Sequence, residues 1–537
     1  MKPLHLVYLF LLGIVFCQDK NDSIERTDTI NTESGPVRGI KINKYGMDLY
    51  GFLGIPYAEP PVGSLRFKPP KPISSWNDVL DADKNGPQCL QVSEFLTEDE
   101  EASEDCLTLN VFTNNIGTNG PFRKKSQPVM VWIHGGGFTI GSKDLYRMDE
   151  LLTEDVVYVA MNYRLAALGF MSFGNDVVSG NMGLKDQQLA IQWVRNNIQH
   201  FGGDPNRITI FGESAGALSV QAQVLSPWND GLLNGAIAQS GSILNLHFQP
   251  QGSEMKYAKN IADTLGCPTT LDESTLECLQ KVDMDKMLPN ITDADEAQYD
   301  PSILIKYFTF PVVDSYATNP FIPLDPLEAL KTGMFNRITY MSGTCLLEGV
   351  LTTGPLQYYG VTGAATMSLI ELPAETPWNI NIGKGKTFNK IVQMFYNHTT
   401  GDTRFEQEKP TIDFFTDTYF LSSDQKSVEI MSGYVKNVYN YLFSQSTNNS
   451  LLAGLMDLSE EYTPGHFDDV PFLLDLDELS KVSPDTTKGF SEEEKSTSKH
   501  MIKYWTNFAK YGNPTGVEDD AHEPVWNPVG PDQKVII

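Results

Sequence analysis

Short, mostly apolar runs recur in the middle of the chain. Four of them predict strands: residues 129–133 (VMVWI), 156–160 (VVYVA), 208–211 (ITIF) and the weaker 235–238 (GAIA). Strands that are apolar on both faces are typical of a sheet that is covered on both sides. Between the second and third runs, residues 184–200 carry apolar side chains at roughly helical spacing. Strands that alternate with helices predict an α/β fold with a mostly parallel sheet.

The second half of the chain has a less regular pattern. Residues 269–314 are acidic and irregular, which predicts an inserted cap or loop rather than a separate domain. A helix is predicted over residues 491–511, because Ser491 and Glu494 have capping-box spacing at its start and Gly512 follows its end. We therefore expect one large α/β domain.

The N-terminal residues 1–17, MKPLHLVYLFLLGIVFC, predict a secretory signal peptide, which leaves 18–537 as the mature domain. Lys2 precedes an apolar run that is too short to span a membrane. No later segment has eighteen consecutive apolar residues, and the C-terminal GPDQKVII carries no retention signal or lipid-anchor tail. The sequence thus predicts a secreted, extracellular protein without a membrane anchor.

Composition and charge narrow the function classes. The chain of 537 residues is 41% hydrophobic and 20% charged, which is typical of a globular protein. Its formal net charge of −28 would repel nucleic-acid phosphates and disfavours anionic membranes. We expect the acidic surface to serve solubility, with attraction of cationic substrates as the alternative.

Cysteines and glycosylation sequons agree with secretion. Cys17 lies in the predicted signal peptide, which leaves five cysteines, two close pairs among them and one unpaired thiol. Neither close pair has the C-x-x-C spacing of a zinc site, and we expect no metal or other cofactor. Four asparagines begin N-glycosylation sequons: Asn21, Asn290, Asn397 and Asn448.

The motif G-x-S-x-G occurs at 212–216, inside FGESAGA. Such a pattern arises by chance in roughly one chain in five of this length, so the motif alone identifies nothing. Its context is more specific, because the predicted strand 208–211 precedes it and a predicted helix, 217–224, follows. Strand, tight turn and helix form the nucleophile elbow that exposes a serine hydroxyl. Ser214 is therefore the candidate nucleophile, rather than a serine that only caps a helix.

A glycine-rich loop follows the first predicted strand. HGGGF at 134–138 matches the HGGG-type loop whose backbone N–H groups stabilise an oxyanion. We expect the donors at Gly136 and Gly137, with Ala215 beside the serine as the third.

A base and an acid must follow the serine in the order of an α/β-hydrolase. His466 lies in the loop PGHFDD ahead of the mostly apolar run 470–474, and it is the candidate base by elimination. The other histidines after the serine lie too close to it, within a sequon, in the predicted late helix or in an acidic tail: His247, His398, His500 and His522. Glu348 follows the strand-like run 338–341 and is a candidate acid, but it is one of 68 acidic residues, and the residues alone favour a surface glutamate.

Together these motifs resemble the carboxylesterase/cholinesterase branch of the α/β-hydrolases over residues 35–527. Besides HGGGF and FGESAGA, the matching motifs are FLGIPYA (52–58), SEDCL (103–107), NYR (162–164), DQ (186–187), FGGDP (201–205), FPVVD (310–314), EG (348–349) and YWTNFA (504–509). The resemblance implies an α/β-hydrolase fold with Glu348 as the third member of a Ser–His–Glu triad. It also implies two disulfides, a free thiol and a structural ion pair, at Cys89–Cys106, Cys267–Cys278, Cys345 and Arg66–Glu104.

Departures from the family pattern narrow the expected subfamily. Cholinesterases bind choline with a tryptophan in the loop after the first disulfide cysteine, and residues 90–105 contain none. Juvenile hormone esterases tend to show GQSAG in place of GESAG. Thr108 and Ala166 replace residues that are usually aromatic and glycine, and neither is expected to touch the chemistry. The chain is most similar to secreted insect carboxylesterases.

The sequence therefore predicts a secreted serine carboxylic-ester hydrolase that cleaves small to medium esters through an acyl-enzyme. One alternative is a lipase-like esterase for longer acyl chains, and Phe138 and Phe310 are candidate walls of its pocket. The other alternative is a non-catalytic adhesion protein similar to neuroligins. Such proteins typically lack a triad residue and carry a membrane span, whereas this sequence keeps all three residues and shows no span.

Overall fold

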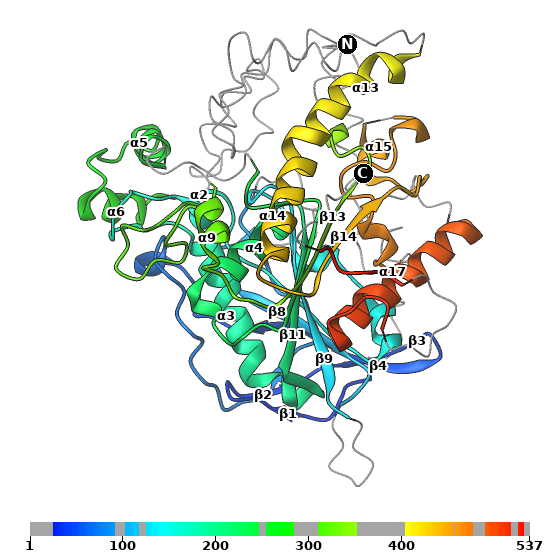
Figure 1. Ribbon diagram of the computed structural model, residues 1–537. Helices are drawn as coiled ribbons and strands as arrows, with labels where there is room; N and C mark the ends of the chain where they lie inside the picture. The colour runs from blue at the N-terminus through cyan, green and yellow to red at the C-terminus, as the bar shows by residue number, and fades with distance from the viewer. Residues whose placement is uncertain are drawn as a thin grey trace, which may run out of the picture.

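A twisted sheet of nine strands forms the centre of the computed structural model, with helices on both of its faces (Figure 1). The structure describes residues 25–91, 102–116, 125–245, 254–283, 310–351, 403–456, 458–475, 489–516 and 525–530. The predicted signal peptide, residues 1–17, lies outside these residues, as do the sequons at Asn21, Asn290 and Asn397. The sequon at Asn448 lies within them, and this asparagine is exposed.

The strand order of the sheet is β14-β13-β12-β11-β9-β10-β8-β4-β3. Six neighbouring strands run parallel: β14 (Val438–Phe443), β13 (Thr339–Cys345), β12 (Gly235–Gln239), β11 (Gly203–Glu213), β9 (Gln127–Ile133) and β10 (Val157–Met161). Antiparallel pairs at one edge add β8 (Thr108–Thr113), β4 (Met47–Pro56) and β3 (Ile40–Lys44). The four predicted strands between 129 and 238 are confirmed, and so is the mostly parallel sheet.

Alternate residues of β9 enter two apolar clusters on opposite faces of the sheet. Val129 and Val131 pack in the cluster that includes residues of α3 (Met182–Asn197) and α4 (Ala215–Leu225), whereas Trp132 packs in the cluster that includes α17 (Glu492–Tyr511). Figure 1 shows α3 and α4 on one side of the strands and α17 on the other. This two-residue period is that of a strand buried on both faces, and each fully buried aliphatic side chain contributes roughly 1.5–3 kcal/mol.

The predicted helices are confirmed. The predicted helix 184–200 corresponds to α3 and the 3₁₀ turn η5 (Ile198–Phe201). In α17, the Ser491 side chain accepts from the backbone N–H of Glu494, whose carboxylate accepts from the N–H of Ser491 in return. The helix ends at Gly512, whose φ of 68° is left-handed and favours glycine.

The two disulfides and the ion pair that the resemblance implied are confirmed. Cys89–Cys106 and Cys267–Cys278 are bonded, and Cys345 is free and buried. The Arg66 guanidinium donates two hydrogen bonds to the Glu104 carboxylate, at 2.7 and 2.6 Å. None of the helices within the described ranges is long and apolar enough to cross a bilayer.

The other described elements flank the central sheet. Residues 284–309 of the acidic region 269–314 lie outside the described ones, and its described part includes the helix α6 (Glu273–Leu279). The described elements that flank the sheet are β1 (Ile30–Asn31), β2 (Pro36–Arg38), β5 (Leu80–Asp81), β6 (Gln88–Cys89), β7 (Ala102–Ser103), η1 (Gly63–Leu65), η3 (Lys143–Leu145), η4 (Asp149–Glu154), α2 (Ala166–Phe170), η6 (Pro227–Asn229), α5 (Glu254–Thr264), α6 (Glu273–Leu279), α9 (Pro326–Thr332), α13 (Arg404–Phe415), η8 (Thr416–Leu421), α14 (Ser422–Ser432), α15 (Leu451–Leu455), η9 (Glu460–Tyr462) and η10 (Val470–Phe472).

Candidate active site

Ser214 lies at the turn between β11 and α4, as the nucleophile elbow requires. Its φ of 57° and ψ of −122° are unusual for a residue with a side chain, and such a conformation costs roughly 1–3 kcal/mol. The turn is fixed on both sides, because the Ser214 N–H donates to the carbonyl of Gln239 and its carbonyl accepts from Leu218. A Cβ at Gly216 would lie 2.1 Å from the carbonyl oxygen of Ile133, so only glycine lets α4 pass this close to β9.

The HGGGF loop lies against this elbow. A Cβ at Gly135 would lie 3.2 Å from the Cβ of Ser214, which places the loop beside the serine. Gly136 has a φ of 99°, a left-handed conformation that glycine adopts without strain. Ala215 is the first residue of α4, where backbone N–H groups have no partner within the helix. The start of the glycine-rich loop and the start of α4 therefore meet at Ser214, and the donor roles of Gly136, Gly137 and Ala215 stay a prediction.

Contacts of Phe138 also support the HGGGF loop. The carbonyl of Phe138 accepts from the N–H of Ala166 at 2.7 Å, so the backbone of Ala166 supports the glycine-rich loop, a contact that the sequence did not reveal. The Phe138 ring is fully buried. It packs against the tilted ring of Phe170, with centroids 4.8 Å apart, and edge-on against the ring of Phe310, with centroids 6.4 Å apart. The two predicted pocket residues, Phe138 and Phe310, therefore lie next to each other.

His466 and Glu348 form a direct pair. The Nδ1–H of His466 donates to Oε2 of Glu348 at 2.6 Å, and both side chains are buried. The second oxygen of Glu348 accepts from the backbone N–H of Cys345, also at 2.6 Å. The loops that carry the pair are joined as well, because the N–H of Leu347 donates to the carbonyl of Pro464. The predicted base and acid are thus held together by side chains and backbone.

Glu213 is a functional candidate that sequence reasoning missed. Its Oε1 lies 3.1 Å from Nε2 of His466, the ring nitrogen opposite Glu348. The sequence indicated Glu213 only as a feature that separates this chain from one subfamily. Its position next to Ser214 at the end of a buried strand could have suggested a carboxylate in the site, but no motif predicts its contact with a loop more than two hundred residues away.

The protonation states of His466 and Glu213 depend on each other. Burial alone would lower the pKa of His466, but the carboxylates of Glu213, Glu348 and Asp469 outweigh burial and raise that pKa to about 9. Burial raises the pKa of Glu213 to about 8. Nε2 of His466 and Oε1 of Glu213 therefore titrate as a coupled pair.

Two further buried carboxylates hold the histidine loop. Asp468 accepts from the backbone N–H of Gly465 at 2.7 Å, and burial raises its pKa to about 7. Asp469 accepts from the Gln239 amide at 3.0 Å and from the Tyr441 hydroxyl at 2.8 Å, and burial raises its pKa to about 6. These bonds tie the loop to β12 and β14. The negative surroundings favour a positive charge on the imidazole ring.

Replacing Glu213 by glutamine is expected to move the acid limb of kcat/KM to lower pH. The histidine must be free of its proton to act as a base, and Glu213 is the largest contributor that raises its pKa. Removing that negative charge lowers the pKa of His466, and we expect a shift of roughly one unit or more. Rates of ester hydrolysis between pH 4 and 10 measure it. Glu328→Gln, which changes an exposed glutamate on α9, is the control, and equal profiles would exclude this role of Glu213.

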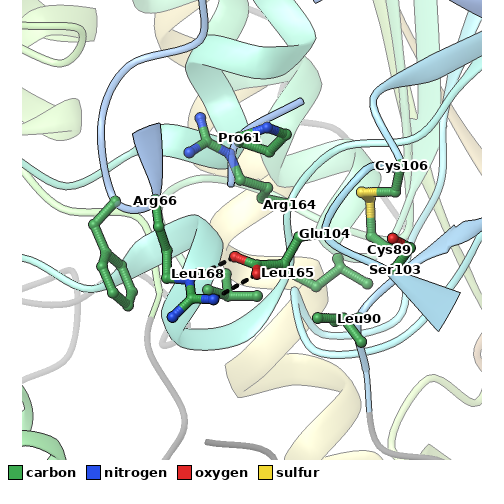
Figure 2. A pocket seen from close by; sticks show the side chains of 11 residues that line it. Pro61, Arg66, Cys89, Leu90, Ser103, Glu104, Cys106, Arg164, Leu165 and Leu168 are labelled. Carbon is green, nitrogen blue, oxygen red and sulfur yellow. Dashed lines mark hydrogen bonds and ion pairs between the residues drawn. A yellow bond between two sulfur atoms is a disulfide. The ribbon is translucent and has the colours of Figure 1, made fainter. Parts of the chain in front are cut away.

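A separate, small hollow lies beside the first disulfide (Figure 2). Its walls include Arg66, Glu104 and Leu168, and none of the triad residues lines it. Arg66 pairs with Glu104 there and also donates to the backbone carbonyl of Val282 at 2.8 Å. These bonds fix the Arg66 side chain as a structural junction. Within the described ranges, no group of three or more His, Cys, Asp and Glu residues is placed to hold a metal ion.

A family model and several known esterases are similar to this chain. The model of a family described as the carboxylesterase family matches residues 26–537. A carboxylic ester hydrolase of Bombus ignitus is 39% identical over 65% of this chain and 60% of that protein. Venom carboxylesterase-6 of Apis mellifera is 32% identical over 100% of this chain and 94% of that protein. Juvenile hormone esterase of Tribolium castaneum is also 32% identical, over 93% and 85%. Equal identity to esterases with different names does not distinguish their substrates.

Proposed function

The chain belongs to the carboxylesterase family and is a serine carboxylesterase, and from that premise we propose that it cleaves small to medium carboxylic esters through an acyl-enzyme on Ser214. The observation that supports this mechanism most is the hydrogen bond of 2.6 Å between His466 Nδ1 and the buried Glu348 carboxylate. A histidine held in this way has its Nε2 available as a base when the imidazole ring is neutral.

Acylation uses the serine, the histidine, the glutamate and the backbone oxyanion donors of the site. Nε2 of His466 removes the proton of the Ser214 hydroxyl while the oxygen attacks the ester carbonyl carbon. Glu348 orients the ring and stabilises the imidazolium that forms. The developing oxyanion accepts hydrogen bonds from the N–H groups of Gly136, Gly137 and Ala215, and loss of one such donor typically costs about 10²–10³ in kcat.

Departure of the alcohol completes acylation, and deacylation then repeats these steps with water as the nucleophile. His466 gives its proton to the departing alcohol, which leaves an ester between Ser214 and the acyl group. Water then attacks this ester while His466 accepts its proton, and Ser214 leaves with the proton restored. The cycle is complete with these side chains and water, and the carboxylic acid and the alcohol are its products.

We also propose that the protein is secreted as one domain, residues 18–537, with N-linked glycans. The signal-peptide pattern at 1–17 supports secretion, and the two disulfides are typical of proteins that fold in an oxidising compartment. The exposed sequon at Asn448 is accessible to a glycan. Mass measurement of protein from the culture medium of a eukaryotic host, before and after removal of glycans, tests these points together.

A panel of aryl esters tests the proposed substrate class. We expect purified protein to hydrolyse acetate and butyrate esters and to lose this activity when one organophosphate is bound per chain, on the peptide that contains Ser214. The burst of alcohol before steady state measures formation of the acyl-enzyme. Faster cleavage of emulsified long-chain esters would favour the lipase-like alternative. Undiminished hydrolysis after complete labelling would contradict the proposed nucleophile.

A further inference from the structure

One long helical segment passes both loops of the His466–Glu348 pair. It consists of α13 (Arg404–Phe415), the π-helical turn η8 (Thr416–Leu421) and α14 (Ser422–Ser432), and it forms the yellow rod of Figure 1. π-Helices hold well under 1% of residues in globular proteins and often occur at functional sites. The π-helical turn of this segment is therefore a candidate for a functional role.

Side chains of the segment stabilise the wide turn itself. The hydroxyl of Thr418 donates to the carbonyl of Phe414 at 2.6 Å, and the hydroxyl of Ser423 donates to the carbonyl of Phe420 at 2.9 Å. These bonds satisfy backbone carbonyls around a turn in which the regular α-helical pattern is interrupted. The sequence thus maintains the π turn with its own hydroxyl groups.

The first contact of the turn is with the acid loop. Oγ1 of Thr416 accepts from the backbone N–H of Gly349 at 2.9 Å, and Gly349 directly follows Glu348. The rod and the loop are in close contact here, because a Cβ at Gly349 would lie 2.0 Å from the carbonyl oxygen of Ile412. Ile412 also packs in a small apolar cluster with neighbours from both loops: Leu347, Val350 and Tyr462.

The second contact is with the histidine itself. The ring of Phe420 lies 4.9 Å from the imidazole of His466, centroid to centroid, at an interplanar angle of 46°. The Phe420 side chain is 2% exposed. Twelve residues earlier in the rod, Glu408 accepts from the hydroxyl of Tyr462, in the loop ahead of His466, at 2.6 Å. The rod therefore contacts the histidine loop at the ring and at its approach.

We propose that Thr416 and Phe420 are positioning residues, which hold Glu348 and His466 in register from one π-helical turn. The inference rests on the proposed catalytic roles of that pair. Glu348 and His466 come from loops after different strands, and a bond of 2.6 Å tolerates little relative movement. Thr416 fixes the backbone next to the acid, and the Phe420 ring limits rotation of the imidazole. Small displacements of catalytic groups are costly, since about 1 Å can reduce the rate 10²-fold.

Two pairs of matched variants test the proposal. Thr416→Val removes the acceptor for Gly349, and Thr506→Val removes a buried hydroxyl that donates to a backbone carbonyl within α17. Phe420→Leu removes the ring beside His466, and Phe321→Leu makes the same change at a fully buried side chain that packs against Trp228. We expect Thr416→Val and Phe420→Leu to lower kcat by about 10-fold or more with little change in KM, whereas the controls retain kcat. Thr416→Ser, which keeps the hydroxyl, restores it.

The pH profile separates positioning from general destabilisation. When His466 moves away from Glu348, it loses part of the interaction that raises its pKa, so the acid limb of kcat/KM shifts to lower pH in Thr416→Val and Phe420→Leu. Loss of folding stability alone lowers the melting temperature without moving this limb. Equal kcat and equal pH profiles in the variants and their controls would overturn the proposal. Absence of esterase activity in the parent protein would instead contradict the proposed function.

Discussion

Ser214→Ala is expected to lower kcat for a short-chain aryl ester by about 10⁶-fold while the protein remains folded. The hydroxyl oxygen is the atom that forms the covalent bond, and no neighbouring group replaces it in the proposed cycle. Alanine and serine share the same Cβ, so the left-handed conformation at this position carries the same strain in both. The residual rate reflects water attack assisted by the oxyanion donors.

Ser240→Ala is the matched control for this experiment. Ser240 follows β12, the strand beside β11, and has a φ of 55°, close to that of Ser214. It is fully buried and has no proposed step in the cycle. We expect Ser240→Ala to keep kcat within a few-fold of the parent, with organophosphate still bound to Ser214. A Ser214→Ala protein that hydrolyses esters at a rate within tenfold of the parent would exclude Ser214 as the nucleophile.

Glu348→Gln is expected to lower kcat by about 10⁴-fold. The carboxylate accepts from Nδ1 of His466, and this bond places the proton on Nδ1 and leaves Nε2 to act as the base. A glutamine that turns its amide N–H₂ toward Nδ1 favours the opposite tautomer, in which Nε2 carries the proton. The acid limb of the remaining activity is expected at lower pH, because one of the negative charges that raise the pKa of His466 is gone.

Single-turnover kinetics between pH 5 and 10 measure this effect apart from product release. Glu494→Gln is the control, because Glu494 is also buried and hydrogen-bonded, but to Thr447 and the start of α17. It is expected to reduce stability and leave kcat unchanged. Glu348→Asp keeps the charge on a shorter side chain and should fall between parent and glutamine variant. A loss of less than tenfold in Glu348→Gln would remove Glu348 from the triad.

The sheet was predictable because its central strands are apolar runs in the sequence. A strand that is buried on both faces has few polar residues, and each run in 129–238 has this pattern. The pattern misplaced the start of β11, which begins at Gly203 rather than near Ile208. Gly203 and Pro205 are typical of a loop, yet Gly203 pairs with Gln127, and the register shifts between Gly203 and Ile208. Tertiary pairing overrides local preference there.

The residues of the candidate site differ in how strongly the sequence indicates them. Ser214 has a local signal, since strand, glycine turn and helix lie next to each other in the chain. His466 followed from chain order and elimination, and Glu348 was one weak candidate after a predicted strand until the family resemblance assigned it. Glu213 and the π turn at 416–421 have no comparable signal, because their importance comes from contacts with loops far away in sequence. Contacts of this kind depend on the folded arrangement, not on residue type or spacing.

The backbone bond between Leu347 and Pro464 has a consequence for local unfolding. It joins the acid loop to the histidine loop, and Gly465 bridges to Leu347 in the same parallel arrangement. Segments linked in this way tend to open as one cooperative unit rather than one after the other. A fluctuation that frees the base therefore also frees the acid, and both are recovered in a single closing event. Amide exchange at Leu347 consequently reports the fraction of molecules that have an assembled pair.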